Sequence, residues 1–485
     1  MALEIKNGKW RILTPHTMSD TVRCAVYDLY GIVDAYLPYP LAVTDEAVFQ
    51  PEQYDENLII LGTVGDGDFC KTLAGRGFFV PETHKEGYSI CVGASPFREG
   101  RQVIVLCGAD GAGLLYAVHA FDMRYLRDKC RYYTSCTRAP FATFDAEMPA
   151  WEYRSYPKID RRGIWCWGHT IYDYRAYFHN MSALGLNHLV VWNDYVPLNA
   201  AEVLSEAHRR GIRIYWGFSC CWGEKVDPSD PRDVEKWTAR VLDVYTREYA
   251  PLGGDGIYFQ AFTETNDREM GGRPIAALVT DWANAICGAL HAVYPTLDIE
   301  FGIHATSIKD DYQTLSGIDP NVAVMWEDCG DFPYAYSPAR QAGADDAIAY
   351  TEKLLSLNGK DTRFAAVLKG FSVLDWSRFE HYHGPTVLGE APKDFLARRN
   401  AEKRFVWQYV RPYWLSGIGK LSDYCRTVAD SGVRETTVTA LIEDGMFECH
   451  TAPAAVVFAG MLWDWTQDQG ALIRMAEHSA DLATT

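Results

Sequence analysis

The chain has 485 residues, of which 48% are hydrophobic and 23% charged, and its net charge is −18 at neutral pH. This is an ordinary globular balance, and the length allows about two to four domains with a sizeable core. The acidic surface argues against nucleic acid or an anionic membrane as a partner, because both require a basic footprint.

The cysteines and the hydropathy pattern indicate the compartment. The 13 cysteines are odd in number and form no CxxC pair, which is typical of reduced thiols in a cytosolic protein. The N-terminus is polar from its fourth residue and lacks the apolar core of a signal peptide. No run approaches the ~18 apolar residues of a membrane span. We therefore expect a cytoplasmic protein, and the sequence leaves a homo-oligomer open.

The first region, residues 1–145, is expected to be a small α/β accessory domain. Residues 58–62 and 103–107 are short apolar runs typical of buried parallel strands. A glycine-rich turn at 108–113 and a helical pattern at 114–121 follow the second run. The turn is either a phosphate-cradling loop or a tight structural turn. It lacks the Gly-Lys-Ser/Thr of a P-loop and the full dinucleotide fingerprint, which favours the structural interpretation.

Residues 139–157 contain prolines at positions 140, 149 and 157 and show no clear period, so we interpret them as the interdomain connection. From residue 150 onward, apolar strand patterns alternate with amphipathic helices, for example at 200–210, 233–249 and 275–293. The expected strands are 163–167, 188–192, 213–218, 256–262, 298–304, 322–326, 363–368 and 437–442.

Eight such units predict a (β/α)₈ TIM barrel over 150–485, with a doubly wound open sheet as the alternative. A long segment at about 370–432 separates the last two strands and is expected to carry a helical insertion or a lid.

In a barrel, chemistry is located where strands end and the following loops begin. The predicted strand ends are rich in acidic, amide and indole side chains. Sugar hydroxyls bind carboxylates and amides, and the C–H face of a pyranose packs on an indole ring. Glycosidic cleavage also requires a proton-donating carboxyl group and a second carboxylate that acts as base or nucleophile, unless the substrate supplies its own.

Glu264 is the first candidate for the acid. It follows the apolar strand 256–262 directly, so we expect it to point into the barrel mouth. Phe262 and nearby indoles would raise its pKa, as a general acid requires. The alternative is an exposed loop acid or a helix N-terminal cap.

Glu327 and Asp328 are the candidates for the base or nucleophile, because they follow strand 322–326 immediately. A like-charged pair at a buried strand end favours one protonated member. The alternative is one residue facing inward and one paired outside. Asp194 and Glu443 are further acidic candidates.

The remaining candidates would bind substrate. His169 and His304 are suited to bind hydroxyl groups or to pack, and some of the tryptophans are expected to fill the core. His381 and His383 could hold a metal, but no acidic or cysteine cluster lies near them in sequence, so neither metal nor cofactor is expected. The expected substrate-binding residues are His169, Trp192, Asn193, Asp194, Trp222, His304, Trp326, Lys369 and Glu443.

A strand followed by GADGAG and LLYAVHAF resembles the accessory domain that precedes the barrel in β-N-acetylhexosaminidases and α-glucuronidases. The chain is similar to both groups in placing this domain before a barrel that begins at Arg161-Arg-Gly-Ile-Trp165. Hexosaminidases of this type carry an Asp-Glu pair after strand four, and here Thr263-Glu264 stands there. The α-glucuronidases resemble this small-polar-Glu arrangement but use a lysine just before the acid, where Gln260 stands here.

This resemblance implies an exo-acting glycoside hydrolase for a terminal N-acetylhexosaminide or hexuronide, related to both groups and with its own substrate. Glu264 would match the acid, and Glu327 or Asp328 the base. Two other classes remain open. One is a non-catalytic carbohydrate-binding barrel, which an exposed, unpaired Glu264 would favour. The other is a metal-dependent sugar lyase or isomerase, which a metal near His304 or His381 would favour.

Overall fold

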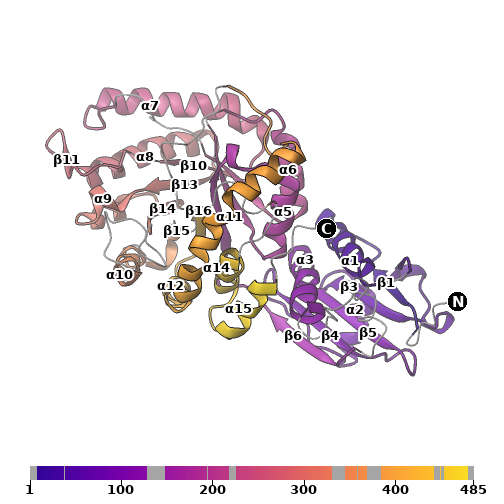
Figure 1. Ribbon diagram of the computed structural model, residues 1–485. Coiled ribbons are helices and arrows are strands. Elements are labelled where there is room, and N and C mark those ends of the chain that lie inside the picture. The colour runs from indigo at the N-terminus through magenta and orange to yellow at the C-terminus, as the bar shows by residue number, and fades with distance from the viewer. Residues whose placement is uncertain are drawn as a thin grey trace.

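The computed structural model describes residues 8–37, 39–127, 148–193, 195–217, 226–260, 262–329, 344–357, 359–368, 384–441, 448 and 453–478. The chain forms a six-stranded sheet with helices, which we call the sheet unit, and a closed eight-stranded barrel surrounded by helices (Figure 1). The predicted α/β class is confirmed, with a (β/α)₈ barrel preceded by a smaller α/β part.

The sheet unit has the strand order β2-β1-β3-β5-β4-β6. The strands β1, β2, β3 and β5 run parallel, whereas β4 is antiparallel to both of its neighbours. The apolar runs predicted at 58–62 and 103–107 lie in β3 and β5 and pair in parallel, as expected. The strands are β1 (Trp10–Thr14), β2 (Ala42–Asp45), β3 (Asn57–Thr63), β4 (Tyr88–Ala94), β5 (Gln102–Gly108) and β6 (Trp151–Ser155).

Both faces of the central strands β3 and β5 are buried, which explains why these two strands are almost continuously apolar. Ile59 and Ile104 pack with helices α1 (Asp20–Asp34) and α3 (Gly111–Ala120) on one face. On the other face, Ile60 packs with α2 (Asp68–Gly75).

The glycine-rich turn is structural. A Cβ on Gly108 would lie 2.1 Å from the backbone nitrogen of Leu114, and one on Gly113 would lie 2.2 Å from the carbonyl oxygen of Gly87. Asp110 caps α3 by accepting a hydrogen bond from the Gly113 N–H, and its other oxygen accepts from the Glu86 N–H. The motif therefore packs α3 tightly against β5 and fixes the loop at Glu86.

The barrel closes in the order β10-β13-β14-β15-β16-β7-β8-β9 with every neighbouring pair parallel. All eight predicted strands are present, with ends that differ by at most three residues. They are β7 (Arg161–Trp167), β8 (His188–Trp192), β9 (Arg213–Gly217), β10 (Gly256–Gln260), β13 (Asp298–Ile303), β14 (Val322–Cys329), β15 (Arg363–Leu368) and β16 (Glu435–Leu441).

The barrel helices also follow the predicted pattern, and the described part of the 370–432 segment is mainly helical. Within the described residues, one helix (α8) is long and apolar enough by length and composition to cross a bilayer, and 56% of its most apolar window is buried inside the protein. The helices are α5 (Tyr174–Ala183), α6 (Ala200–Arg209), α7 (Pro231–Val244), α8 (Ile275–Val293), α9 (Ala305–Ile308), α10 (Ala344–Leu355), α11 (Lys393–Ser416), α12 (Ile418–Asp430), α14 (Pro453–Trp463) and α15 (Gln469–His478).

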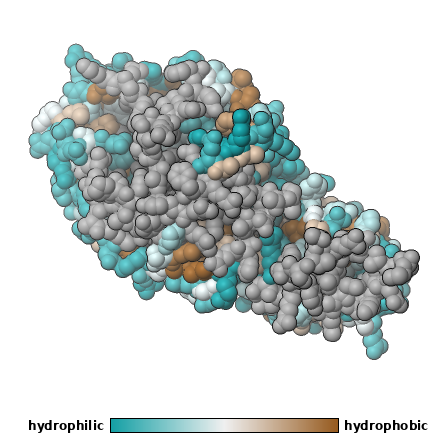
Figure 2. All heavy atoms as spheres, viewed as in Figure 1, coloured by the Kyte–Doolittle hydropathy of each residue, from teal (hydrophilic) through white to brown (hydrophobic). Residues whose placement is uncertain are grey.

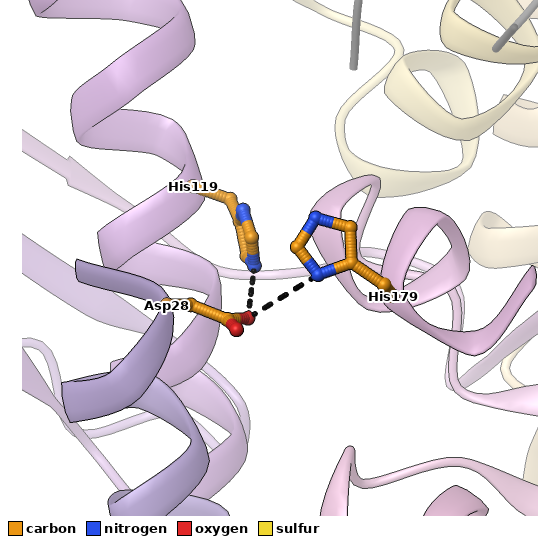
Figure 3. Close-up of side chains that lie close together, drawn as sticks. All are labelled: Asp28, His119 and His179. Carbon is orange, nitrogen blue, oxygen red and sulfur yellow. Dashed lines mark hydrogen bonds and ion pairs between the residues drawn. The ribbon is translucent and has the colours of Figure 1, made fainter. Parts of the chain in front are cut away.

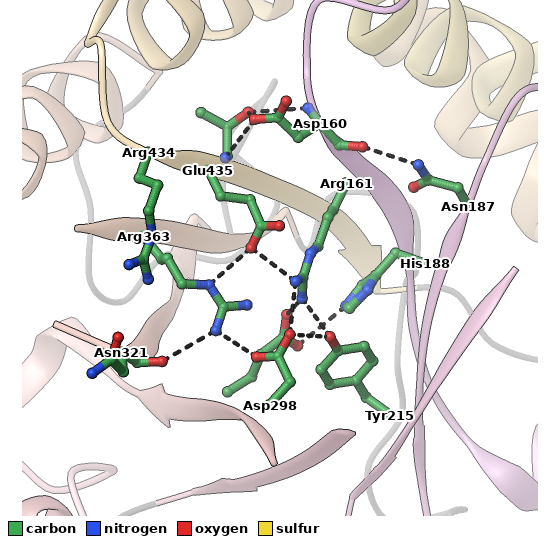
Figure 4. A network of polar contacts seen from close by, with 12 residues as sticks. Asp160, Arg161, Asn187, His188, Tyr215, Asp298, Asn321, Arg363, Arg434 and Glu435 are labelled. Atoms are coloured by element: carbon green, nitrogen blue, oxygen red, sulfur yellow. Dashed lines mark hydrogen bonds and ion pairs between the residues drawn. The ribbon is translucent and has the colours of Figure 1, made fainter. Parts of the chain in front are cut away.

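The N-terminal ends of the barrel strands are closed by a polar network, which we call the bottom network (Figure 4). Arg161 and Arg363, the first residues of β7 and β15, both pair with Asp298 and Glu435. Tyr215 donates its hydroxyl to Asp298 at 2.6 Å. Burial opposes ionisation of Asp298, but the two arginines outweigh it and hold the pKa of Asp298 well below its ordinary value.

Two features join the sheet unit to the barrel. Residues 151–155 form β6 in the sheet, although we interpreted them as part of a connection without regular structure. Trp463, the last residue of α14, packs in the core of the sheet unit, and its indole N–H donates to Ser155 at 2.8 Å. The C-terminal helices accordingly lie where the two parts meet (Figure 1).

One face of the molecule can be described by its hydropathy. The described residues on the face shown in Figure 2 are mostly hydrophilic, and their hydrophobic side chains gather only in small separate patches. A large apolar interaction surface is not visible among the described residues on this face.

Candidate active site

A buried carboxylate, Glu327, forms the centre of the candidate site. It lies on β14 with its side chain 5% exposed, toward the carboxyl end of the barrel. Its Oε1 accepts short hydrogen bonds from the Tyr258 hydroxyl and the Gln260 side-chain amide. Its Oε2 lies 3.2 Å from Nε2 of His304, the residue that follows β13. Three neighbouring strand ends therefore converge on one carboxylate.

The strand pattern explains this convergence. Tyr258 and Gln260 are two residues apart on β10, so both face the barrel interior. Burial, then the neighbouring Glu327 carboxylate, raises the pKa of Tyr258 far above its ordinary value. The hydroxyl therefore keeps its proton at neutral pH and donates a hydrogen bond to Glu327. Donors directed at a carboxylate favour its charged form, so the arrangement is suited to an anionic Glu327.

Gly302 provides the space for this contact. It pairs with Gln260 across β13 and β10. A Cβ at this position would lie 2.0 Å from the Tyr258 hydroxyl oxygen and 2.8 Å from Oε1 of Glu327. Both distances are too short for a carbon–oxygen contact, so a residue without a side chain is required where Tyr258 meets Glu327.

Indole rings line the interior beside this carboxylate. The rings of Trp165 and Trp192 lie 5.7 and 5.9 Å from the Tyr258 ring between centroids, and they are 5.9 Å from each other. A further ring, Trp167, meets Trp165 edge-on at 4.7 Å. The three indoles come from the adjacent strands β7 and β8 and form an aromatic wall next to Tyr258.

A small open hollow lies along this wall, at the ends of the same two strands. His169, Trp192 and Asn193, which the sequence predicts to bind substrate, all line it. Asn193 is fixed by close packing, because a Cβ on Gly168 would lie 1.8 Å from its side-chain oxygen. The other lining residues are Trp167, Tyr195, Gly384 and Thr386.

Thr263 has a supporting position in this site. Its buried hydroxyl accepts a hydrogen bond from the His304 N–H at 2.8 Å, and its carbonyl accepts from the Ser307 hydroxyl at 2.8 Å. The residue that stands in place of a hexosaminidase-like aspartate thus fixes the backbone of His304. It orients the imidazole that contacts Glu327.

The surroundings predicted for Glu264 are wrong. Its side chain is exposed, although the sequence suggested an apolar enclosure. Phe262 does not cover it but meets Trp282 of α8 edge-on, at 5.6 Å between ring centroids. The described residues therefore supply no apolar pocket around Glu264, and its role as acid stays a prediction.

Trp326 is a second correction. We expected it to line the site, but it is fully buried between the barrel and the helices. Its ring packs edge-on against Tyr350 of α10, at 4.9 Å between centroids. Because successive residues of a strand face opposite sides, the inward position of Glu327 turns Trp326 outward.

Several predicted residues lie outside the described part of the chain. Asp328 is in β14, but its side chain is outside the described residues. The other predicted candidates that are not described are Asp194, Trp222, Lys369, His381, His383 and Glu443.

Tyr258 was not predicted as a functional residue, and Gln260 was noted only as a departure from a family pattern. The predicted site residues came from the loops after each strand and not from the inward positions within the strand. Every second residue of a strand faces the same side, so counting back from the end of strand 256–260 would have selected both Gln260 and Tyr258.

A second buried carboxyl group, Glu448, lies near the start of α5. Its Oε1 accepts a hydrogen bond from the Tyr172 N–H at 2.6 Å, while Oε2 has no hydrogen-bond partner among the described residues. Burial raises the pKa of Glu448 to about 8, so this group is largely protonated at neutral pH.

Comparisons with known proteins identify no family for this chain. No family model and no curated protein sequence matches the chain. Among solved structures, the chain is similar to a protein described as "Structure of CpGH84D", with a TM-score of 0.47 and 10% identity over 98% of this chain. The present chain spans 66% of that protein's chain. At this identity and TM-score, the similarity carries no argument about activity.

Proposed function

We propose that the protein is an exo-acting glycoside hydrolase for a terminal sugar of the N-acetylhexosaminide or hexuronide class. The observation that supports this most directly is Glu327, a buried carboxylate that contacts Tyr258, Gln260 and His304. Glycosidases require a carboxylate that remains ionised near the reacting carbon. The donors around Glu327 serve that requirement.

In this proposal, Glu327 is the base or nucleophile. The hydroxyl of Tyr258 and the amide of Gln260 occupy Oε1, so Oε2 and its His304 contact face the reaction. The indole wall of Trp165, Trp167 and Trp192 would pack against the C–H face of the sugar ring. Asn193 and His169 would bind its hydroxyl groups from the adjoining hollow.

Glu264 is the proposed acid. It follows Thr263, which binds the backbone of His304, so the carboxyl-bearing loop starts beside the Glu327 cluster. In the free protein Glu264 is exposed. A bound sugar that covers Glu264 would remove water from around the carboxyl group and place it next to the leaving oxygen.

The decisive experiment compares Glu327→Gln and Glu264→Gln with the surface variant Glu269→Gln. The substrates are aryl and unactivated glycosides, including N-acetylhexosaminides, uronides and neutral hexosides. Loss of acid–base function costs about 10²–10⁴-fold in rate, so we expect losses of this order in the first two variants and wild-type rates in the third. Full activity of Glu327→Gln would refute the proposed base, and full activity of Glu264→Gln on an unactivated glycoside would refute the proposed acid.

The exposure of Glu264 also favours a second candidate, a carbohydrate-binding barrel without catalysis. This candidate predicts sugar binding that depends on Trp192 but no turnover of any glycoside in the panel. Calorimetric titration with the same sugars separates the two candidates. Activity that is lost on chelation and restored by added metal would instead indicate the sugar lyase or isomerase.

A further inference from the structure

A cluster outside the barrel interior brings together Asp28, His119 and His179, each from a different helix (Figure 3). Asp28 lies on α1 and His119 on α3, both in the sheet unit, whereas His179 lies on α5 of the barrel. The Asp28 and His119 side chains are 4% and 3% exposed, and that of His179 is 26% exposed. The cluster thus bridges the two parts of the molecule and is open to solvent on the His179 side.

The three ligand atoms lie within 4.8 Å of one another, close enough to reach a common ion. Nε2 of His119 lies 3.0 Å and Nδ1 of His179 lies 3.6 Å from the same oxygen, Oδ2 of Asp28. Ligands about 2.0–2.2 Å from a tetrahedral zinc ion are about 3.3 Å apart. The 3.6 Å contact is too long for a hydrogen bond, yet it is close to the ligand spacing.

The chemistry of the groups is equally suited to a transition ion. Two imidazole nitrogens and one carboxylate oxygen are a set that zinc binds, with a fourth position left for water. The partly exposed His179 leaves a route for that water and for the ion. The two imidazole rings meet nearly at right angles, with 82° between their planes, so their nitrogens approach the carboxylate from different directions.

Arg210 is the main competitor for Asp28, because its NH1 lies 2.9 Å from Oδ2. The guanidinium has a second carboxylate partner, since its Nε donates to Glu206 at 3.1 Å. It also keeps a neighbour in the Ser182 hydroxyl at 3.4 Å. Arg210 therefore remains paired when an ion takes a share of the Asp28 carboxylate.

We propose that Asp28, His119 and His179 bind one divalent transition ion, preferably Zn²⁺, that fastens the sheet unit to the barrel. The ion would join α1 and α3 to α5, and its stabilising effect would come from closing this contact. The site lies among helices outside the barrel interior, so its role is structural and independent of the proposed hydrolysis.

The test is calorimetric titration of chelator-treated protein with Zn²⁺. We expect one ion per chain for the wild type, and at least tenfold weaker binding for His179→Gln and His119→Gln. The matched control is His16→Gln, because His16 also pairs with an aspartate, Asp45, at 2.8 Å but on the exposed surface. Circular dichroism verifies that each variant is folded.

Absorption spectroscopy at the zinc edge of the wild type needs no variant. The proposal expects a shell of nitrogen and oxygen at about 2.0–2.1 Å with two imidazoles. A sulfur shell, no binding at all, or equal binding by His179→Gln would overturn it. Equal binding would place the ion elsewhere, for example at His381 and His383.

Discussion

The two ends of the barrel are both polar, but they are built differently. At the bottom, Arg161 and Arg363 pair with Asp298 and Glu435, so positive and negative charges balance. At the mouth, the described contacts of the Glu327 carboxylate include a hydroxyl, an amide and an imidazole. A charge balanced by fixed counter-charges stabilises the fold, whereas one held by polar donors stays available to a substrate. The comparison assigns stability to one end and chemistry to the other.

The largest effect on stability is expected from Asp298→Ala at the bottom. This change removes one of the two carboxylates that Arg161 and Arg363 share and leaves them only Glu435 in common, and breaking a buried ion pair costs up to about 3–5 kcal/mol of unfolding free energy. The control Asp281→Ala removes an exposed partner of Arg273 and should cost at most about 1 kcal/mol. Urea unfolding measures both. Equal costs for the two variants would contradict the stabilising role of the bottom network.

The same network gives a pH dependence. The folded pKa of Asp298 is lowered, so its contribution is complete above the unfolded value of about 3.9 and is lost as the pH falls through the lower folded value. We therefore expect the stability difference between wild type and Asp298→Asn to be constant from pH 7 to 5 and to shrink below pH 4. A difference that grows on acidification would contradict the assigned ion pairs.

A smaller stability effect, with a change in activity, is expected from Gly302→Ala at the mouth. The added methyl group meets the Tyr258 hydroxyl and Glu327, and overpacking of this kind costs about 1–3 kcal/mol. Turnover should fall because Glu327 is displaced. The control is Gly288→Ala on α8, where a Cβ meets no atom within 4 Å. Thermal unfolding measures the stability of both variants, and glycoside kinetics measure their turnover. Unchanged kinetics in Gly302→Ala would contradict a catalytic role of Glu327.

An effect that varies with pH is expected from Glu448→Gln. Because the pKa of Glu448 is raised to about 8, the folded protein keeps a proton that the unfolded chain loses near pH 4.5. Wild-type stability should therefore decline relative to Glu448→Gln between pH 4.5 and 8, by at most about 1.4 kcal/mol per pH unit. Denaturant unfolding at pH 5 and 7.5 measures this change. If the unfolding free energies of the two proteins changed equally with pH, Glu448 would not be a buried neutral acid.

The barrel strands could be predicted because parallel strands buried on both faces are apolar runs. The side chain that each strand presents to the interior was harder to predict. Whether Trp326 or Glu327 faces the barrel interior depends on how β14 pairs with β13 and β15. The register of β14 against β15 is irregular between Trp326 and Cys329. A local pattern does not contain these long-range pairings, and so Trp326 was misplaced.

The contacts of Glu327 depend on tertiary structure in the same way. His304 and Gln260 are far from Glu327 in sequence, and only barrel closure makes them neighbours. The exposure of Glu264 depends on where Phe262 packs, and that is decided by Trp282 of α8. Sequence patterns indicated which strand ends carry chemistry, but not which side chains meet there.

The position of Trp463 has a consequence for biosynthesis. Trp463 is part of the core of the sheet unit, yet it follows its hydrogen-bond partner Ser155 by 308 residues in the sequence. At a translation rate of about 5–20 residues per second, roughly 15–60 s separate the synthesis of these two residues. During that interval the nascent sheet unit exposes the apolar surface around Tyr88 and Tyr116 that the indole later covers. The sheet unit therefore reaches its final packing only after the C-terminal helices have been synthesised.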